Sequence, residues 1–263
     1  MAVTGARIPA AALALAAVFV GLAPGALAQP RSGGERGGSP LGALGDMLFP
    51  DKQGTSRRPP PPPVGRYVSE SGQAFVLDRS TGKPMLRFEG SNEIWVLEPH
   101  TGARGDTIYK NDAGRVMLRD TRVGGLILFT PERREGAAAA LSGETNPIRL
   151  APVPPKALLQ RLLASSTLAS RAARRQILFE AEASPASSAL IADASVTTAE
   201  ALVGMSRSPG GREQLARVNR VFITEGPRPG VLLRRGVLIV IVTPHLGLGG
   251  RPSSERVTFA TTH

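Results

Sequence analysis

Ser80 and Lys83 form an S-x-x-K pattern, in which a lysine activates a serine nucleophile. That chemistry requires the two side chains to lie one helical turn apart. Gly82 and Pro84 stand in and beside this segment and favour a hairpin turn instead. The pattern therefore predicts a turn between two strands rather than an acylation site.

Four carboxylates, Glu98, Asp106, Asp112 and Asp120, lie near one another in the sequence. A pair of carboxylates can hydrolyse a glycosidic bond, so a cell-envelope hydrolase is an alternative to be tested. Asp112 belongs to the segment NDAG, where an aspartate typically bonds to the backbone of its own turn. We expect the other three to bracket strands or to pair with arginines.

Other catalytic patterns are missing from the chain. It has no cysteine, its three histidines are His100, His245 and His263, and no H-x-x-x-H or G-x-S-x-G motif occurs. We therefore predict no metal site, no cofactor and a protein that is not an enzyme.

A basic stretch from residue 109 to 122 is the best candidate for binding. Strand alternation places Val116 and Leu118 on one face, and Arg115, Met117 and Arg119 on the other. If the first pair faces the core, the predicted binding surface consists of Tyr109, Lys110, Arg115, Arg119 and Arg122.

Arginine forks suit phosphate and carboxylate groups. This surface would attract lipid phosphates or acidic glycans. The alternative is a solvated strand face whose arginines pair with Glu98, Asp112 and Asp120.

The net charge of +11 and the pI near 11.3 favour anionic partners such as nucleic acid, lipid headgroups or acidic envelope polymers. Aromatic residues make up only 4%, which argues against specific nucleic-acid recognition through base stacking. The hydrophobic fraction of 41% is enough for a packed core.

The first residues are typical of an export signal. Arg7 precedes an apolar stretch from Ala10 to Val20, and Ala26-Leu27-Ala28 fits a signal peptidase site, so residues 1–28 are predicted to be cleaved off. The apolar stretch is shorter than the roughly 20 residues of a membrane span. We expect a periplasmic or secreted protein with no integral membrane span after cleavage.

Residues 29–63 form a predicted disordered linker, Gly/Ser-rich at first and ending in a proline-rich rod at 57–63. From 64 to 150 the apolar residues alternate, with turn residues between the runs. We predict an antiparallel β-meander that closes as a small barrel or folds as a sandwich. Its expected strands are 66–70, 73–78, 84–90, 93–98, 106–111, 115–120 and 125–130.

Residues 151–263 are predicted to form an α+β module of helices packed on a short antiparallel sheet. It follows a second linker at 137–155, and its tail at 245–263 is predicted to be loop with an edge strand. Helices are expected at 155–175, 185–207 and 212–218, and strands at 176–183, 219–226, 230–234 and 236–244.

Four segments, RFEGSNEIWVLEP, RGDTIYKNDAGRVMLR, RVGGLILFTPER and GLGGRPSSERV, together resemble an uncharacterised family of exported alphaproteobacterial proteins, domain of unknown function 4908. The resemblance implies export and a shared fold, but no activity. A weaker similarity links Thr101–Gly114 to the periplasmic barrels that inhibit C-type lysozyme, which would imply an inhibitor.

The sequence therefore predicts an exported, non-enzymatic envelope protein. Its expected role is a binding module for anionic envelope components or for a protein partner.

Overall fold

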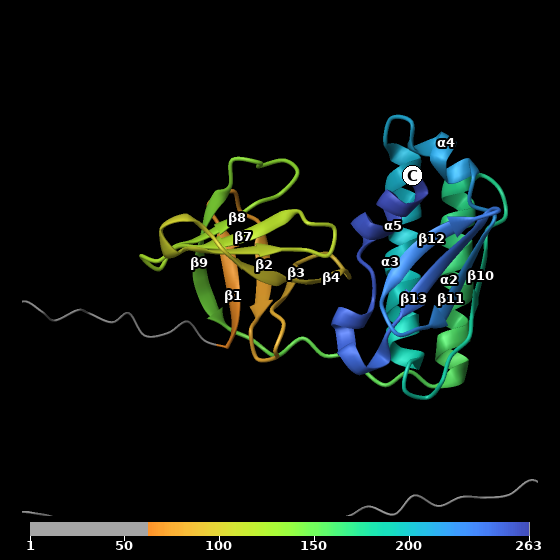
Figure 1. Cartoon of the computed structure of the whole chain (residues 1–263), viewed down its shortest axis with the longest axis horizontal. Coiled ribbons are helices and arrows are strands. Elements are labelled where there is room, and N and C mark those ends of the chain that lie inside the picture. The colour runs from red at the N-terminus through yellow and green to blue at the C-terminus, as the bar shows by residue number, and fades with distance from the viewer. Residues whose placement is uncertain (1–62, 263) are drawn as a thin grey trace, which may run out of the picture. The chain divides into compact units, whose positions relative to one another are not determined.

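The computed structural model describes residues 63–262. The predicted signal peptide and the linker up to residue 62 lie outside the described residues. The described chain has the predicted α+β fold, in which a nine-stranded antiparallel sheet precedes helices and a smaller sheet (Figure 1).

The large sheet is a meander that nearly closes on itself. Its spatial order is β4-β3-β2-β1-β9-β8-β7-β6-β5. The two strands at the ends of this order, β4 and β5, are consecutive in the chain and are separated by Leu97 alone, which is fully buried. This corner brings the ends of the sheet together and gives it a nearly barrel-like form. The strands are β1 (Val64–Ser69), β2 (Ala74–Asp78), β3 (Met85–Phe88), β4 (Ile94–Val96), β5 (Glu98–Thr101), β6 (Thr107–Lys110), β7 (Val116–Asp120), β8 (Leu126–Leu128) and β9 (Ala137–Glu144).

Short turns set the antiparallel direction of these strands. Gly114 (φ 85°) and Gly124 (φ 86°) turn the chain between β6, β7 and β8, in a left-handed conformation that favours glycine. Inside, side chains from several strands build one core, which includes Phe75, Leu77, Leu86, Met117, Leu118 and Leu128.

The predicted linker at 137–155 was wrong over its first eight residues, which form the strand β9. Its sequence AAAALSGE has low β-propensity, but the strand pairs on one side with β1 and on the other with β8. Pairing on both sides therefore stabilises a strand that its own residue types do not favour.

The second half contains four helices and four strands, together with the short 3₁₀ segment η2 (Pro244–Gly250). The helices are α2 (Pro155–Ala173), α3 (Ser188–Arg207), α4 (Gly211–Ala216) and α5 (Ser254–Thr262). The strands are β10 (Leu178–Ala181), β11 (Arg220–Glu225), β12 (Gly230–Arg234) and β13 (Val237–Val242).

The small sheet is mixed, which corrects the prediction of an antiparallel one. In its order β10-β11-β13-β12, the pairs β10–β11 and β11–β13 are parallel, and only β12–β13 is antiparallel. The physical reason for the parallel β10–β11 pair is the connection through α3 and α4, which returns the chain to the end where β10 began. The chain then reverses between β11 and β12, and again at the tight turn of Arg235-Gly236, so that β13 runs parallel to β11.

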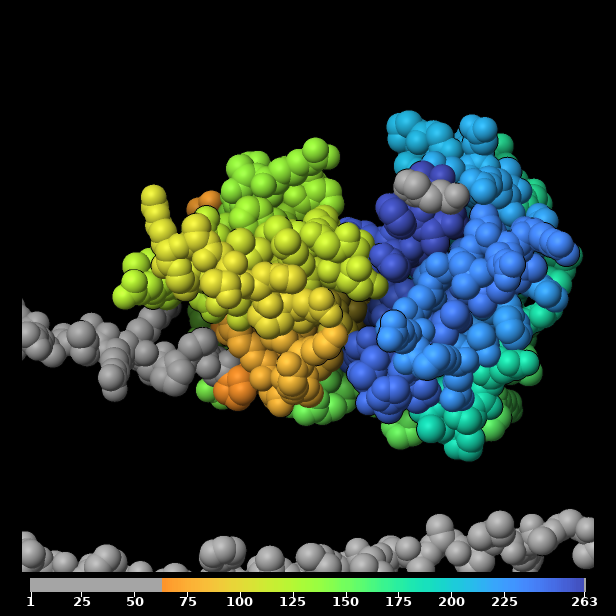
Figure 2. All heavy atoms as spheres, viewed as in Figure 1, coloured from red at the N-terminus to blue at the C-terminus, as the bar shows by residue number. Residues whose placement is uncertain are grey.

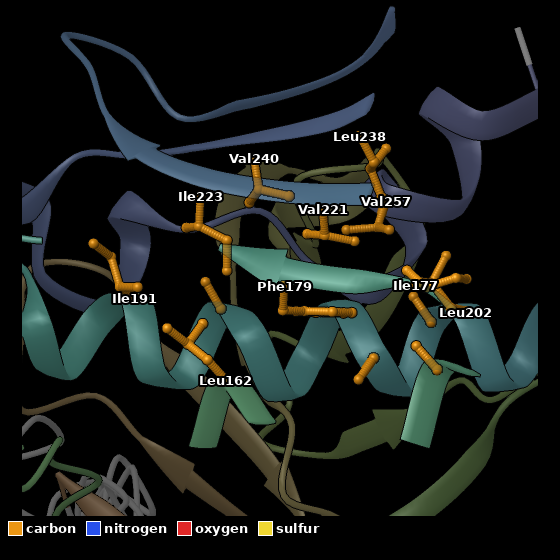
Figure 3. Packing of buried hydrophobic residues seen from close by; sticks show 14 of the residues in the cluster. Leu162, Ile177, Phe179, Ile191, Leu202, Val221, Ile223, Leu238, Val240 and Val257 are labelled. Carbon is orange, nitrogen blue, oxygen red and sulfur yellow. The ribbon is translucent and has the colours of Figure 1, made fainter. Parts of the chain in front are cut away.

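α2 and α3 pack on one face of this sheet (Figure 1). Side chains of α2, α3 and the strands interlock there, among them Leu162, Ile191, Phe179, Val221 and Leu238 (Figure 3). The other face, formed by β11, β12 and β13, is turned toward the viewer in Figure 2, and its Phe222 and Ile239 are only half-buried.

The C-terminal tail is helical rather than the predicted loop and edge strand. Ser253 caps α5, because its Oγ accepts a hydrogen bond of 3.2 Å from the Arg256 N–H. Val257 is fully buried and joins the core of the second half.

Candidate binding site

The five predicted binding residues do not form one open surface. Tyr109 is buried in the core of the large sheet, with 8% of its surface exposed. Arg122 is exposed on the turn after β7, and Lys110 is half-buried on β6.

A β-bulge in β7 explains why residues 115–119 do not alternate between core and surface as predicted. Tyr109 pairs with Leu118, and Lys110 pairs with Val116, so Met117 is an extra residue in β7. Met117 and Leu118 are both fully buried in the same core. The prediction that Met117 faces outward with the arginines was therefore wrong.

Arg119 is engaged in an ion pair. Its Nε and Nη2 both donate to Asp106 Oδ2, the former at 2.7 Å, and Asp106 Oδ1 accepts the Arg122 N–H at 3.0 Å. The Arg122 N–H and the Arg119 guanidinium hold the pKa of Asp106 below its ordinary value. These contacts hold the turn after β7 against the start of β6.

Arg115 points to the second half of the protein. Its Nε lies 2.6 Å from Glu255 Oε1 on α5, although the N–H is not aligned for a hydrogen bond, and its guanidinium lies 5.4 Å from the ring centroid of Trp95. Asn111 Nδ2 donates to the other oxygen of Glu255 at 2.7 Å. This cluster joins the large sheet to α5.

Arg251 is at the centre of the junction between the large sheet and the second half. This role was not predicted from the sequence. The Arg251 side chain is 2% exposed. It forms an ion pair with Asp193 on α3, and its Nη2 donates to the Ile94 carbonyl on β4 at 2.7 Å. Nη1 donates to the Pro252 carbonyl at 3.1 Å. One buried guanidinium therefore links both halves.

Two carboxylates of the large sheet bind the start of α5. Asp112 Oδ2 accepts the Ser253 N–H at 2.9 Å, and Glu93 accepts the Ser254 N–H at 2.8 Å and the Ser254 Oγ–H at 2.7 Å. Free N–H groups and the helix dipole favour negative charge at this end. Burial nevertheless raises the pKa of Glu93 to about 7, against these hydrogen bonds.

The sequence held one indication of this junction. A serine at the cap position, here Ser253, followed by an acidic residue in the first turn, here Glu255, is a common pattern at the start of a helix. Its docking partners are 141 to 161 residues away in sequence, so no local pattern could reveal them.

The remaining candidate catalytic carboxylates form ion pairs. Lys83 Nζ pairs with Glu98 at 2.9 Å, and Arg79 pairs with Asp120 at 3.2 Å. Ser80 and Lys83 lie in bends rather than on a helix, and His100 and His245 are exposed on β5 and η2.

Within residues 63–262, no group of three or more histidine, aspartate and glutamate side chains could hold a metal ion. None of the described helices is long and apolar enough to cross a membrane.

Within residues 64–262, the excess positive charge lies in the second half. Residues 64–144 contain eleven Lys and Arg and eleven Asp and Glu, whereas residues 145–262 contain fifteen and seven, a net charge of +8. Residues 145–179 contain six basic residues and no acidic one. The densest positive region is therefore α2 and its approach, not the predicted strand.

α2 buries one side and exposes another. Leu158, Leu162, Ser165 and Ala169 face the core. The opposite side, which we call the outer face of α2, consists of the exposed residues Lys156, Leu159, Gln160, Leu163, Thr167 and Arg171. This face combines cations with two leucines that are 58% and 59% exposed.

A family model described as a domain of unknown function (DUF4908) matches residues 43–261. No curated protein and no solved structure matches the chain, so the similarity to lysozyme inhibitors is not supported.

Proposed function

The chain belongs to the family described as a domain of unknown function (DUF4908), and we propose for it a role that this description leaves open. It is an exported, non-enzymatic protein of the cell envelope that binds anionic lipid surfaces through the outer face of α2. The observation that carries this proposal is the concentration of unbalanced positive charge on and before α2.

The outer face of α2 has cations available for a ligand. Lys156 and Arg171 are exposed, and neither side chain forms an ion pair with another described residue. By contrast, Arg175 at the end of this segment donates to the carbonyls of Leu215, Ala216 and Val218 and is occupied within the protein. Each basic residue near an anionic membrane surface contributes about 1 kcal/mol.

The exposed leucines favour a lipid surface over an acidic glycan. Leu159 and Leu163 stand one helical turn apart beside the cations, as in helices that lie in the plane of a membrane interface. An acidic glycan would satisfy the charge but would gain nothing from these apolar side chains.

Co-sedimentation with vesicles tests this role. We expect the mature protein to bind vesicles of phosphatidylglycerol and phosphatidylcholine at low salt, and to bind pure phosphatidylcholine weakly. Binding should decline as salt rises, because the screening length is about 10 Å at 0.1 M. Lys156→Glu/Arg171→Glu should abolish it, and Leu159→Ser/Leu163→Ser should weaken binding to vesicles but not to an immobilised acidic glycan.

The matched control is Arg87→Glu/Lys110→Glu in the large sheet, which changes the net charge equally. If this control loses as much binding as the α2 variant, net charge alone is responsible and the outer face of α2 is not the site. Circular dichroism of each variant checks that α2 remains helical.

Export and the absence of catalysis have separate tests. Mass spectrometry of cell fractions should find a mature protein that begins at Gln29, whereas a retained Met1 in the membrane fraction would contradict cleavage. A broad hydrolase screen should detect no turnover. Turnover that Asp106→Asn or His100→Ala abolishes would show an enzyme instead.

A further inference from the structure

A cavity of about 420 Å³ lies away from the outer face of α2. Its wall is formed by the turn after β2, by β3 and β4, by the approach to α2 and by η2. Its lining consists of five large apolar residues (Met85, Val96, Leu150, Leu246 and Leu248), three glycines (Gly82, Gly247 and Gly249), Thr81, and the two cations Lys83 and Arg149. This volume falls within the range of about 300–1,000 Å³ that is typical of small-molecule sites.

The apolar base of the cavity is held in place by core packing. Met85 and Leu248 are 5% and 8% exposed and belong to one buried cluster with Ile148. Gly247 has φ 56° and ψ −139°, a conformation that favours glycine, and it lies between Leu246 and Leu248. A Cβ at Gly249 would lie 3.5 Å from Val96 Cγ1 and 3.6 Å from Lys83 Cδ. The glycine-rich segment is therefore folded to form this wall.

The two cations are available to an incoming anion. Lys83 pairs with Glu98, but both side chains are about half exposed, at 52% and 55%, and such a pair is weak. Arg149 is exposed, and its Nη1 donates a long hydrogen bond of 3.4 Å to the Ile148 carbonyl. No acidic residue is among the described residues that line the cavity.

We propose that this cavity binds an anionic amphiphile: one alkyl chain that carries a single carboxylate or phosphate group. The alkyl chain packs on the leucines, Met85 and Val96, and the anionic group displaces Glu98 from Lys83 and contacts Arg149. The few hydrogen-bonding groups in the lining do not suit a sugar, and the cations do not suit a cationic ligand. The cavity acts independently of the outer face of α2, so either site can fail its test without the other.

Isothermal titration calorimetry of the mature chain tests the ligand class. Dodecanoate and dodecyl phosphate, both below their micelle concentrations, should bind with a stoichiometry of one. Dodecyltrimethylammonium and inorganic phosphate should not bind. A preference between the two anionic ligands identifies the headgroup. Equal binding of the cationic amphiphile, or no binding of either anionic one, would overturn the proposal.

Exposed positions supply variants that should leave the fold intact. Lys83→Gln and Arg149→Gln should each weaken binding by roughly tenfold, the effect of losing one charge-assisted hydrogen bond. Leu246→Asp places a negative charge on a side chain that is 45% exposed and should abolish binding. Arg87→Glu and Lys156→Glu/Arg171→Glu should bind as the wild type does. If the three cavity variants also bind as the wild type does, the ligand sits elsewhere and the proposal is wrong.

Discussion

The Arg251 guanidinium contacts three partners inside the protein: Asp193, the Ile94 carbonyl and the Pro252 carbonyl. Arg251→Met should lower the free energy of unfolding by about 3–5 kcal/mol, because it leaves a largely buried carboxylate without its counter-charge. Urea unfolding measures this. Arg256→Met, on the exposed side of α5, is the matched control and should change stability by less than about 0.5 kcal/mol. Equal effects of the two variants would show that the buried contacts contribute little.

Because of Glu93, the free energy of unfolding should fall as pH rises. Burial raises its pKa from 4.5 to about 7, with Arg251 and the Ser254 hydrogen bonds acting against the shift and Glu200 adding to it. Between these values the unfolded chain loses a proton that the folded chain keeps, so rising pH favours unfolding. The loss begins near pH 4.5 and is complete above about 7.

The test compares wild type with Glu93→Gln. From about pH 5 to pH 8, the wild type should lose up to about 3 kcal/mol relative to the variant, which cannot ionise there. Urea midpoints across this range measure the difference. A constant difference between the two proteins would mean that Glu93 keeps an ordinary pKa.

At the scale of elements, β9 is a strand that its neighbours stabilise. Ala138 and Ala140 are exposed and pair with Ile127 and Val68. Ala138→Thr/Ala140→Thr should raise the free energy of unfolding by about 0.5–1 kcal/mol, because β-branched residues suit a strand better than alanine. Ala139→Pro should lower it by several kcal/mol, since this central strand would lose a ladder hydrogen bond. Thermal unfolding of both variants checks the two signs, and a destabilising threonine pair would contradict the argument.

The same element shows which parts of the fold could be predicted from the sequence. Strands bounded by turn residues, such as β2 and β7, were predicted close to their observed positions. β9 was missed because its pairing with β1 joins residues that are 70 to 79 positions apart in the sequence. The direction of β10 and β11 likewise depends on a crossover, not on their own residues.

The site was harder to predict than the fold. The alternation in β7 holds on each side of Met117, but a single extra residue at the bulge separates Arg115 from Arg119. Arg251 and Glu93 acquire their chemistry from partners far away in sequence. The net positive charge was visible in the sequence, whereas the position of Lys156 and Arg171 on the exposed side of α2 followed only from the burial of Leu158 and Leu162.

At the scale of the whole molecule, the two halves share buried groups and should unfold together. Leu248 of η2 packs in one cluster with Met85 and Ile94 of the large sheet, beside the contacts of Arg251. Trp95, the single tryptophan, lies on β4 and reports on the sheet, while far-ultraviolet circular dichroism reports mainly on α2 and α3. In the wild type the two probes should give one urea midpoint, as a two-state transition requires.

Removing the junction should separate these transitions. In Glu93→Ala/Arg251→Met, the contacts of Ser254 and Ile94 across the junction are lost. The ion pair between Arg251 and Asp193 inside the second half is lost as well. We expect the fluorescence midpoint and the circular dichroism midpoint then to differ, because each half retains its own core but loses the coupling. Arg256→Met again serves as the control. Different midpoints already in the wild type would mean that the halves fold as independent units and that Arg251 stabilises only its immediate surroundings.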